Sequence, residues 1–92
     1  MIDPKKTISE AEKIVRNRIL SAPDHTIFQS IEAQLDYIKV LREGKVKDKI
    51  RLKEINLGLY GVREFEESDP ELSRILKELQ FIVDEMRKGR KI

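Results

Sequence analysis

The sequence contains no cysteine and no tryptophan, and only four glycines and three prolines among its 92 residues. The absence of cysteine excludes disulfides, zinc–thiolate sites and thiol nucleophiles. No apolar run approaches the roughly 18 residues that a membrane-spanning helix needs, and the amino end has no signal-peptide core. We therefore expect a cytoplasmic chain with no membrane partner.

Aromatic residues are also scarce, at 5%, whereas charged residues make up 39% of the chain. Enough leucine, isoleucine and valine remain for a modest aliphatic core, so the chain is not expected to be disordered. The net charge is only +2, below the basic excess that is usual in nucleic-acid-binding domains. The length predicts a single domain over residues 1–92.

Helix start and stop signals divide the chain into predicted helices near residues 4–22, 26–43, 48–67 and 70–88. Each predicted helix has a start signal. In chain order these are Asp3 before Pro4, Thr26 with Gln29, Asp48, and the Ser-x-x-Glu box Ser68–Glu71. Gly44 and Gly89 are expected to follow the ends of the second and fourth helices.

Apolar residues recur in each segment at spacings of three and four, which places them on one helix face. The predicted inner faces are Ile8, Ala11, Val15, Ile19 and Ala22; Phe28, Ile31, Leu35, Ile38 and Leu41; Leu52, Ile55, Leu59 and Val62; and Leu72, Ile75, Leu76, Leu79, Ile82, Val83 and Met86. No segment alternates apolar and polar residues over strand length. The prediction is an all-α protein, a small four-helix bundle with short connections.

A second stripe lies opposite the predicted inner face of the third helix, and its four residues fall within about 80° of one another around the helix axis. It consists of Ile50, Leu57, Tyr60 and Glu64. Either this helix is covered on both sides, or Leu57 and Tyr60 anchor a partner. Phe81 lies about 180° from Leu72 on the fourth helix, so it is either an isolated surface residue or a further anchor.

Gly58 and Gly61 lie three residues apart, and this spacing allows two interpretations. One is close approach of another helix or a local kink, and the other is a Gly-x-x-Gly nucleic-acid loop. Because that loop requires a domain with strands, we favour the first interpretation.

Charge is unevenly distributed along the chain. Residues 39–53 hold seven basic residues and two acids, whereas residues 64–71 hold five acids and no base. Glu64, Glu66 and Glu67 fall at the carboxyl end of the third predicted helix, where the helix dipole disfavours negative charge. Together with Asp69 they are predicted to contact a basic partner.

Catalysis, metal binding and cofactor binding find little support. His25, the only histidine, follows Pro23-Asp24 in a connection, with no indicated serine or acid partner. The acids of residues 66–71 match no calcium loop, and no glycine-rich phosphate loop is present. We expect no enzymatic activity, no cofactor and no metal.

The run "QLDYIKVLREGKVKDKIRLKEINLGLYGVREFEESDPELSRILKELQ" and the final "GRKI" resemble the small all-helical immunity proteins of bacterial type VI secretion systems. The closest parts are Gln34 to Ile38, Leu57-Gly58 and Val62 to Arg74. The family's best-known member neutralises an NAD(P)-hydrolysing effector. The resemblance implies a non-enzymatic cytosolic antidote in interbacterial competition, which binds and blocks a co-encoded toxin domain, but it does not carry over that toxin's chemistry. The acidic residues predicted as contacts favour a toxin with a basic, phosphate-holding cleft, one acting on NAD or nucleotides.

Two other function classes stay open: a helical regulator that binds nucleic acid through residues 39–53, and a small enzyme. Self-association also stays open. For the immunity function, the predicted partner-binding residues are Leu57, Tyr60, Glu64, Glu66, Glu67, Asp69 and Phe81.

Overall fold

A computed structural model describes residues 3–90 of the chain. Its elements, in order, are α1 (Pro4–Ser21), α2 (Thr26–Arg42), the 3₁₀ helix η1 (Ile50–Glu54), α3 (Leu57–Tyr60), the π-helical turn η2 (Gly61–Phe65) and α4 (Pro70–Arg87). No strand occurs over this range. The all-α prediction is confirmed, as are the positions of the first, second and fourth helices.

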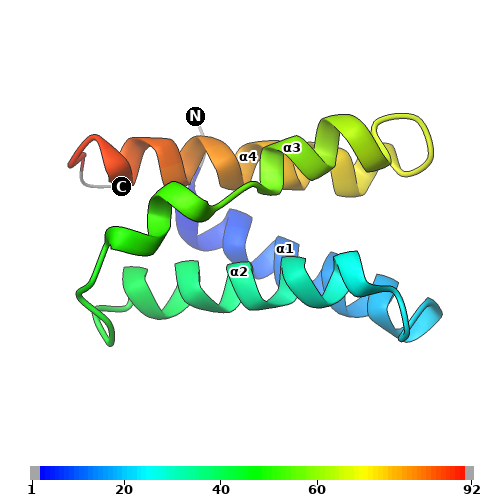
Figure 1. The fold of residues 1–92 in the computed structure, drawn as a ribbon, viewed down its shortest axis with the longest axis horizontal. Coiled ribbons are helices and arrows are strands. Elements are labelled where there is room, and N and C mark those ends of the chain that lie inside the picture. The colour runs from blue at the N-terminus through cyan, green and yellow to red at the C-terminus, as the bar shows by residue number, and fades with distance from the viewer. Residues whose placement is uncertain (1–2, 91–92) are drawn as a thin grey trace.

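The helices form two pairs that pack on each other (Figure 1). α1 and α2 run antiparallel, joined by the short turn after Ser21, and α3 with η2 runs antiparallel to α4. α4 lies against both α1 and α3, so it joins the pairs. The connection from α2 to η1 and the end of α4 lie at one end of the molecule, and the turn between η2 and α4 lies at the other.

The core follows the predicted inner faces of α2 and α4. All five predicted residues of α2 are buried. In α4 six of the predicted residues are buried, with Met86 at the margin: Leu72, Ile75, Leu76, Leu79, Ile82 and Val83. In α1, Ile8, Ala11 and Val15 are buried as predicted, and Ile14, which the sequence did not single out, joins them. Leu72, Ile75, Leu76, Leu79 and Ile82 are completely inaccessible, so α4 is the central helix of the core.

The helix ends confirm some of the predicted caps. The Asp3 carboxylate accepts the N–H groups of Lys5 and Lys6. Asp48 is not the N-cap of η1, which is Lys49, although its carboxylate accepts the N–H of Ile50. Gly44 and Gly89 both have φ of +80°, a left-handed conformation that glycine adopts without strain.

Two predicted capping boxes are wrong. α2 begins after His25 without any side-chain cap, and Thr26 is already its first helical residue. At α4 the capping oxygen belongs to Asp69, which accepts the Leu72 N–H, whereas the Ser68 hydroxyl donates to the Glu64 carbonyl. Aspartate and serine are comparable caps, and Pro70 at the first helical position favours the residue directly before it.

The third predicted helix, 48–67, is not continuous. Ile55 is extended, with φ −69° and ψ 125°, and Asn56 has φ −130° and ψ 31°, so the helical conformation is interrupted between η1 and α3. In an unbroken helix the Asn56 N–H would donate to the carbonyl four residues earlier. Here it donates to the side chain of Gln34 on α2, at 3.0 Å. A tertiary hydrogen bond therefore replaces a local one.

Candidate functional site

After the break at Asn56, the leucine and valine residues of the third segment no longer follow the predicted faces, whereas Leu52, before the break, is buried as predicted. Leu57, expected as an outward anchor, is fully buried, whereas Leu59 and Val62, expected inside, are 46% and 52% exposed. Gly61 and Phe65 are the next buried residues, so the inner face repeats every four residues. This spacing fits a segment that widens into a π-helical turn, a feature found frequently at functional sites.

The two glycines bring α3 and η2 close to α4, as predicted. A Cβ added at Gly58 would lie 2.9 Å from the Gln80 side chain, and one at Gly61 would lie 3.0 Å from the Ser73 carbonyl oxygen. The Ser73 hydroxyl donates to the Gly61 carbonyl at 2.8 Å. These contacts turn the side of the segment that carries Leu59 and Val62 away from α4.

Of the predicted aromatic anchors, Tyr60 is half-buried and Phe81 is 50% exposed. The Tyr60 hydroxyl lies 3.2 Å from that of Ser30 on α2, so this side chain also joins two helices. Phe81 follows Lys77 by one turn of α4, and Lys77 forms an ion pair with Glu66 of the neighbouring segment at 3.3 Å. The exposed face of α4 with Phe81 therefore adjoins the η2 side of the molecule.

The four predicted acidic contacts have different surroundings. Glu64 and Glu67 are exposed and make no ion pair within the described part of the chain. Glu66 is exposed but paired with Lys77. Asp69 is only 23% exposed and holds Arg18 through two hydrogen bonds. That guanidinium lowers the pKa of the Asp69 carboxyl from its usual range. The Asp69 carboxylate therefore stabilises the contact between α1 and the start of α4.

The exposed acids surround a shallow hollow of about 450 Å³. Its lining is Val62, Arg63, Glu64, Glu66, Glu67 and Ser68. We define the acidic–apolar surface as this hollow together with Leu59 and Phe81. It combines exposed aliphatic and aromatic area with unpaired carboxylates, a combination that suits a protein partner with a basic site.

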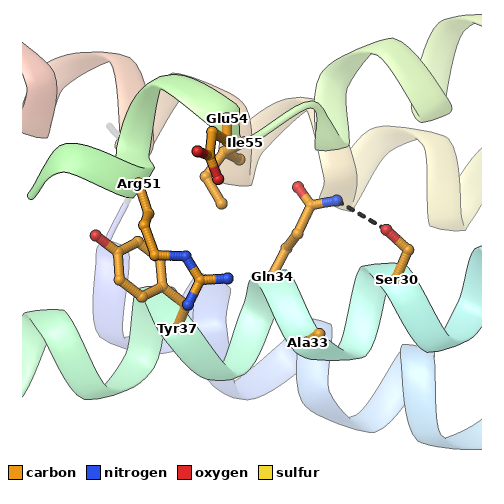
Figure 2. Close-up of a pocket in the computed structure, with 7 residues that line it drawn as sticks. All are labelled: Ser30, Ala33, Gln34, Tyr37, Arg51, Glu54 and Ile55. Atoms are coloured by element: carbon orange, nitrogen blue, oxygen red, sulfur yellow. Dashed lines mark hydrogen bonds between the residues drawn. The ribbon is translucent and has the colours of Figure 1, made fainter.

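A second hollow, of about 250 Å³, lies between α2 and η1 (Figure 2). Tyr37 and Arg51 stand at one end of it, with the guanidinium carbon 5.2 Å from the ring centroid. Gln34 stands at the other end and reaches toward Ser30. The Tyr37 hydroxyl donates to the Asp48 carbonyl, 2.7 Å away, which ties α2 to the connection before η1. The sequence did not point to this hollow, because its two walls meet only in the folded chain.

Other candidate chemistry is not assembled. His25 is exposed, with its ring beside Phe28 at 4.8 Å. Over residues 3–90, no three histidine or acidic side chains gather in a way that could hold a metal ion. None of the described helices is long and apolar enough to cross a membrane.

Comparison with known proteins finds relatives of this chain. The Tsi6 family model matches residues 3–85. Immune protein Tsi6 of Pseudomonas aeruginosa is 34% identical over 89 residues, which cover 97% of this chain and 95% of that protein.

Solved structures agree with that match. A chain in the structure of Tse6 in complex with Tsi6 is 33% identical, with a TM-score of 0.91 over 98% of this chain and 96% of that one. The structure of Tsi6 from Pseudomonas aeruginosa matches with a TM-score of 0.83 at 33% identity, over 89% of this chain and 95% of that one.

Proposed function

This chain belongs to the Tsi6 family, and from that premise we propose that it is an immunity protein, which binds a co-encoded bacterial toxin domain and blocks it. One observation carries the proposal: the likeness to an immune protein, and to a chain solved in complex with Tse6, extends over nearly the whole length of both chains. A shared binding role is easier to infer from such coverage than from a shared fold, because folds host many functions.

We further propose that the acidic–apolar surface contacts the toxin. Leu59 and Val62 take the anchoring role that the sequence had assigned to Leu57, since they are the exposed aliphatic residues of this segment. Phe81 supplies aromatic area on the adjoining face of α4. Apolar residues surrounded by a polar, charged rim are the usual composition of a protein–protein interface.

The charge of this surface favours one class of toxin. An enzyme that acts on NAD or another nucleotide must hold phosphate groups, so its cleft should be basic. Glu64 and Glu67 are exposed and unpaired in the described chain, and they would face such a cleft with opposite charge. Complementary charge raises the association rate and selects the partner.

The proposed action is occlusion rather than catalysis. The hydroxyl that lines the hollow, Ser68, donates to the backbone carbonyl of Glu64 rather than to a carboxylate base, so it is not activated as acyl or phosphoryl transfer would need. The chain would therefore act in equal numbers with its toxin, as a stoichiometric inhibitor.

Cell survival tests this function. Cells that express the toxin encoded beside this gene should survive when this chain is co-expressed and should die without it. The purified chains should form a one-to-one complex by light scattering. A chain that neither protects cells nor binds the neighbouring gene product would overturn the proposal.

A salt titration with a random DNA duplex distinguishes the nucleic-acid alternative. Binding through the basic residues 39–53 would be tight at low salt and would weaken steeply as salt rises, because it depends on counterion release. We expect no measurable duplex binding at physiological salt.

A further inference from the structure

The segment that presents Leu59 and Val62 begins with a helix that is too short to stand by itself. α3 comprises four residues, and its N-cap residue, Asn56, makes no capping hydrogen bond to it. Isolated helices far shorter than about 12 residues do not persist in water. Something outside the segment must therefore hold the start of α3 in place.

Gln34 of α2 holds it from one side. Its Oε1 accepts the Asn56 N–H at 3.0 Å, and its Nε2 donates to the Asn56 Oδ1 at 2.8 Å. The same amide group donates to the Ser30 hydroxyl at 3.1 Å, which fixes its orientation along α2 (Figure 2). Gln34 thus forms hydrogen bonds with both the backbone and the side chain of Asn56.

Gln80 of α4 holds the start of α3 from the other side. Its Oε1 accepts the Gly58 N–H at 3.1 Å, and its Nε2 donates to Asp84 at 3.2 Å. The absence of a side chain at Gly58 allows this approach, because a Cβ there would collide with Gln80. Two glutamines from two different helices thus accept the N–H of the N-cap residue, Asn56, and the N–H of Gly58 in the first turn of α3, which has no partner within the helix.

We propose that Gln34 and Gln80 are positioning residues for toxin binding, which set the place and rotation of α3 and so hold Leu59 and Val62 outward. This inference rests on the proposed function. Leu57 and Leu59 are two residues apart on the helix, and one is buried while the other is exposed. A rotation of α3 would exchange which apolar side chains the partner meets. Anchors held in place before binding lose less freedom when the complex forms.

The test replaces each glutamine by methionine, which keeps the length of the side chain but removes its amide. Gln34→Met loses both hydrogen bonds to Asn56 and should weaken toxin binding by about 30-fold, and Gln80→Met loses one and should weaken it by about 5-fold. Gln34→Glu keeps an acceptor for the Asn56 N–H, and the Asn56 amide can turn its NH₂ toward the carboxylate. This conservative variant should restore most of the affinity.

Two controls separate positioning from loss of stability. Val15→Ala removes core volume from α1, away from α3, and should lower the melting temperature at least as much without changing affinity at a temperature where the chain is folded. Hydrogen exchange at the Asn56 and Gly58 amides should accelerate in the respective methionine variants while the amides of α1 keep their protection.

The outcomes are distinguishable. If the parental chain fails to bind the toxin, the proposed function is overturned, and this role of the glutamines with it. If the parental chain binds and both methionine variants bind equally well, the positioning role alone is overturned. Affinity that falls equally in Val15→Ala would also overturn it, because the effect would then be one of general stability.

Discussion

Arg18 and Asp69, 51 residues apart in sequence, join the end of α1 to the start of α4 through two hydrogen bonds, Nε to Oδ2 at 2.7 Å and Nη2 to Oδ1 at 3.0 Å. The same guanidinium reaches Glu71 at 3.0 Å. Asp69 also accepts the Leu72 N–H as the cap of α4. One carboxylate therefore orders both a helix start and the contact between two helices.

This arrangement predicts acid-dependent stability. Arg18 lowers the pKa of Asp69 in the folded chain below the ordinary value of 3.8. A carboxyl with a lowered folded pKa stabilises the fold fully above its ordinary pKa, and this stability is lost as pH falls through the lowered value. Asp69→Asn keeps a capping oxygen but loses the charge. It should cost about 1–2 kcal/mol at pH 7, since solvent screens a pair of this exposure.

Chemical denaturation of the parental chain and Asp69→Asn at several pH values measures this difference. The gap in free energy of unfolding should be constant from pH 7 to about pH 5 and should shrink below about pH 4. A gap that is the same at pH 7 and pH 2.5 would contradict an ionic origin.

A second prediction concerns which residue caps α4. Asp69→Ala removes both the cap and the ion pair, so it should cost about 1 kcal/mol more than Asp69→Asn. Ser68→Ala removes only a hydroxyl that donates to the Glu64 carbonyl, and it should change stability by less than about 0.5 kcal/mol. Thermal melts of the three variants at neutral pH test the order. A Ser68→Ala loss as large as that of Asp69→Ala would restore the capping box that the structure replaces.

The inner face of α4 supplies a third prediction. Leu79 is completely buried, so Leu79→Ala should lower the free energy of unfolding by about 2–5 kcal/mol through lost burial and a residual cavity. Phe81→Ala, two residues on and half exposed, is the matched control and should cost much less. Similar losses for the two variants in a urea titration would mean that the rotation of α4 is wrong.

The sequence predicted the features that depend on residues close together in the chain, and it failed where a feature depends on residues remote in sequence. Asp3, Gly44 and Gly89 act on neighbouring residues, and the inner faces of α2 and α4 repeat along one helix, so local patterns were sufficient. The third segment failed because its phase depends on Gln34 and Gln80, which are remote in sequence from Asn56 and Gly58. A polar side chain that replaces a backbone partner leaves no periodic signal. Leu57 was therefore assigned outward and Leu59 inward, the reverse of what the fold contains.

A fourth prediction concerns Tyr60, which the sequence analysis named as a toxin contact, and it separates the role of the ring from that of the hydroxyl. Its ring packs against the core and its hydroxyl meets Ser30, so Tyr60→Ala should destabilise the fold as well as the toxin complex. Tyr60→Phe removes only the hydroxyl and should cost about 1 kcal/mol of stability. If the ring itself contacts the toxin, Tyr60→Phe should keep nearly full affinity. A loss of about 2 kcal/mol or more of binding energy in Tyr60→Phe would assign the contact to the hydroxyl instead.

The last prediction concerns the acidic–apolar surface itself. Leu59→Ala and Val62→Ala each remove exposed apolar area, so both variants should stay folded and weaken the toxin complex, by about 2 kcal/mol for a hot-spot residue, mainly through faster dissociation. Ile50→Ala, which changes an even more exposed aliphatic residue on η1, is the control and should bind as the parental chain does. Charge reversal of Glu64 and Glu67 to lysine should slow association and remove much of its salt dependence, whereas Glu32→Lys on α2 should do neither. Binding kinetics at two salt concentrations, together with cell survival, measure these effects. If the Leu59, Val62 and double-lysine variants fold, bind and protect as well as the parental chain, the toxin contacts another face.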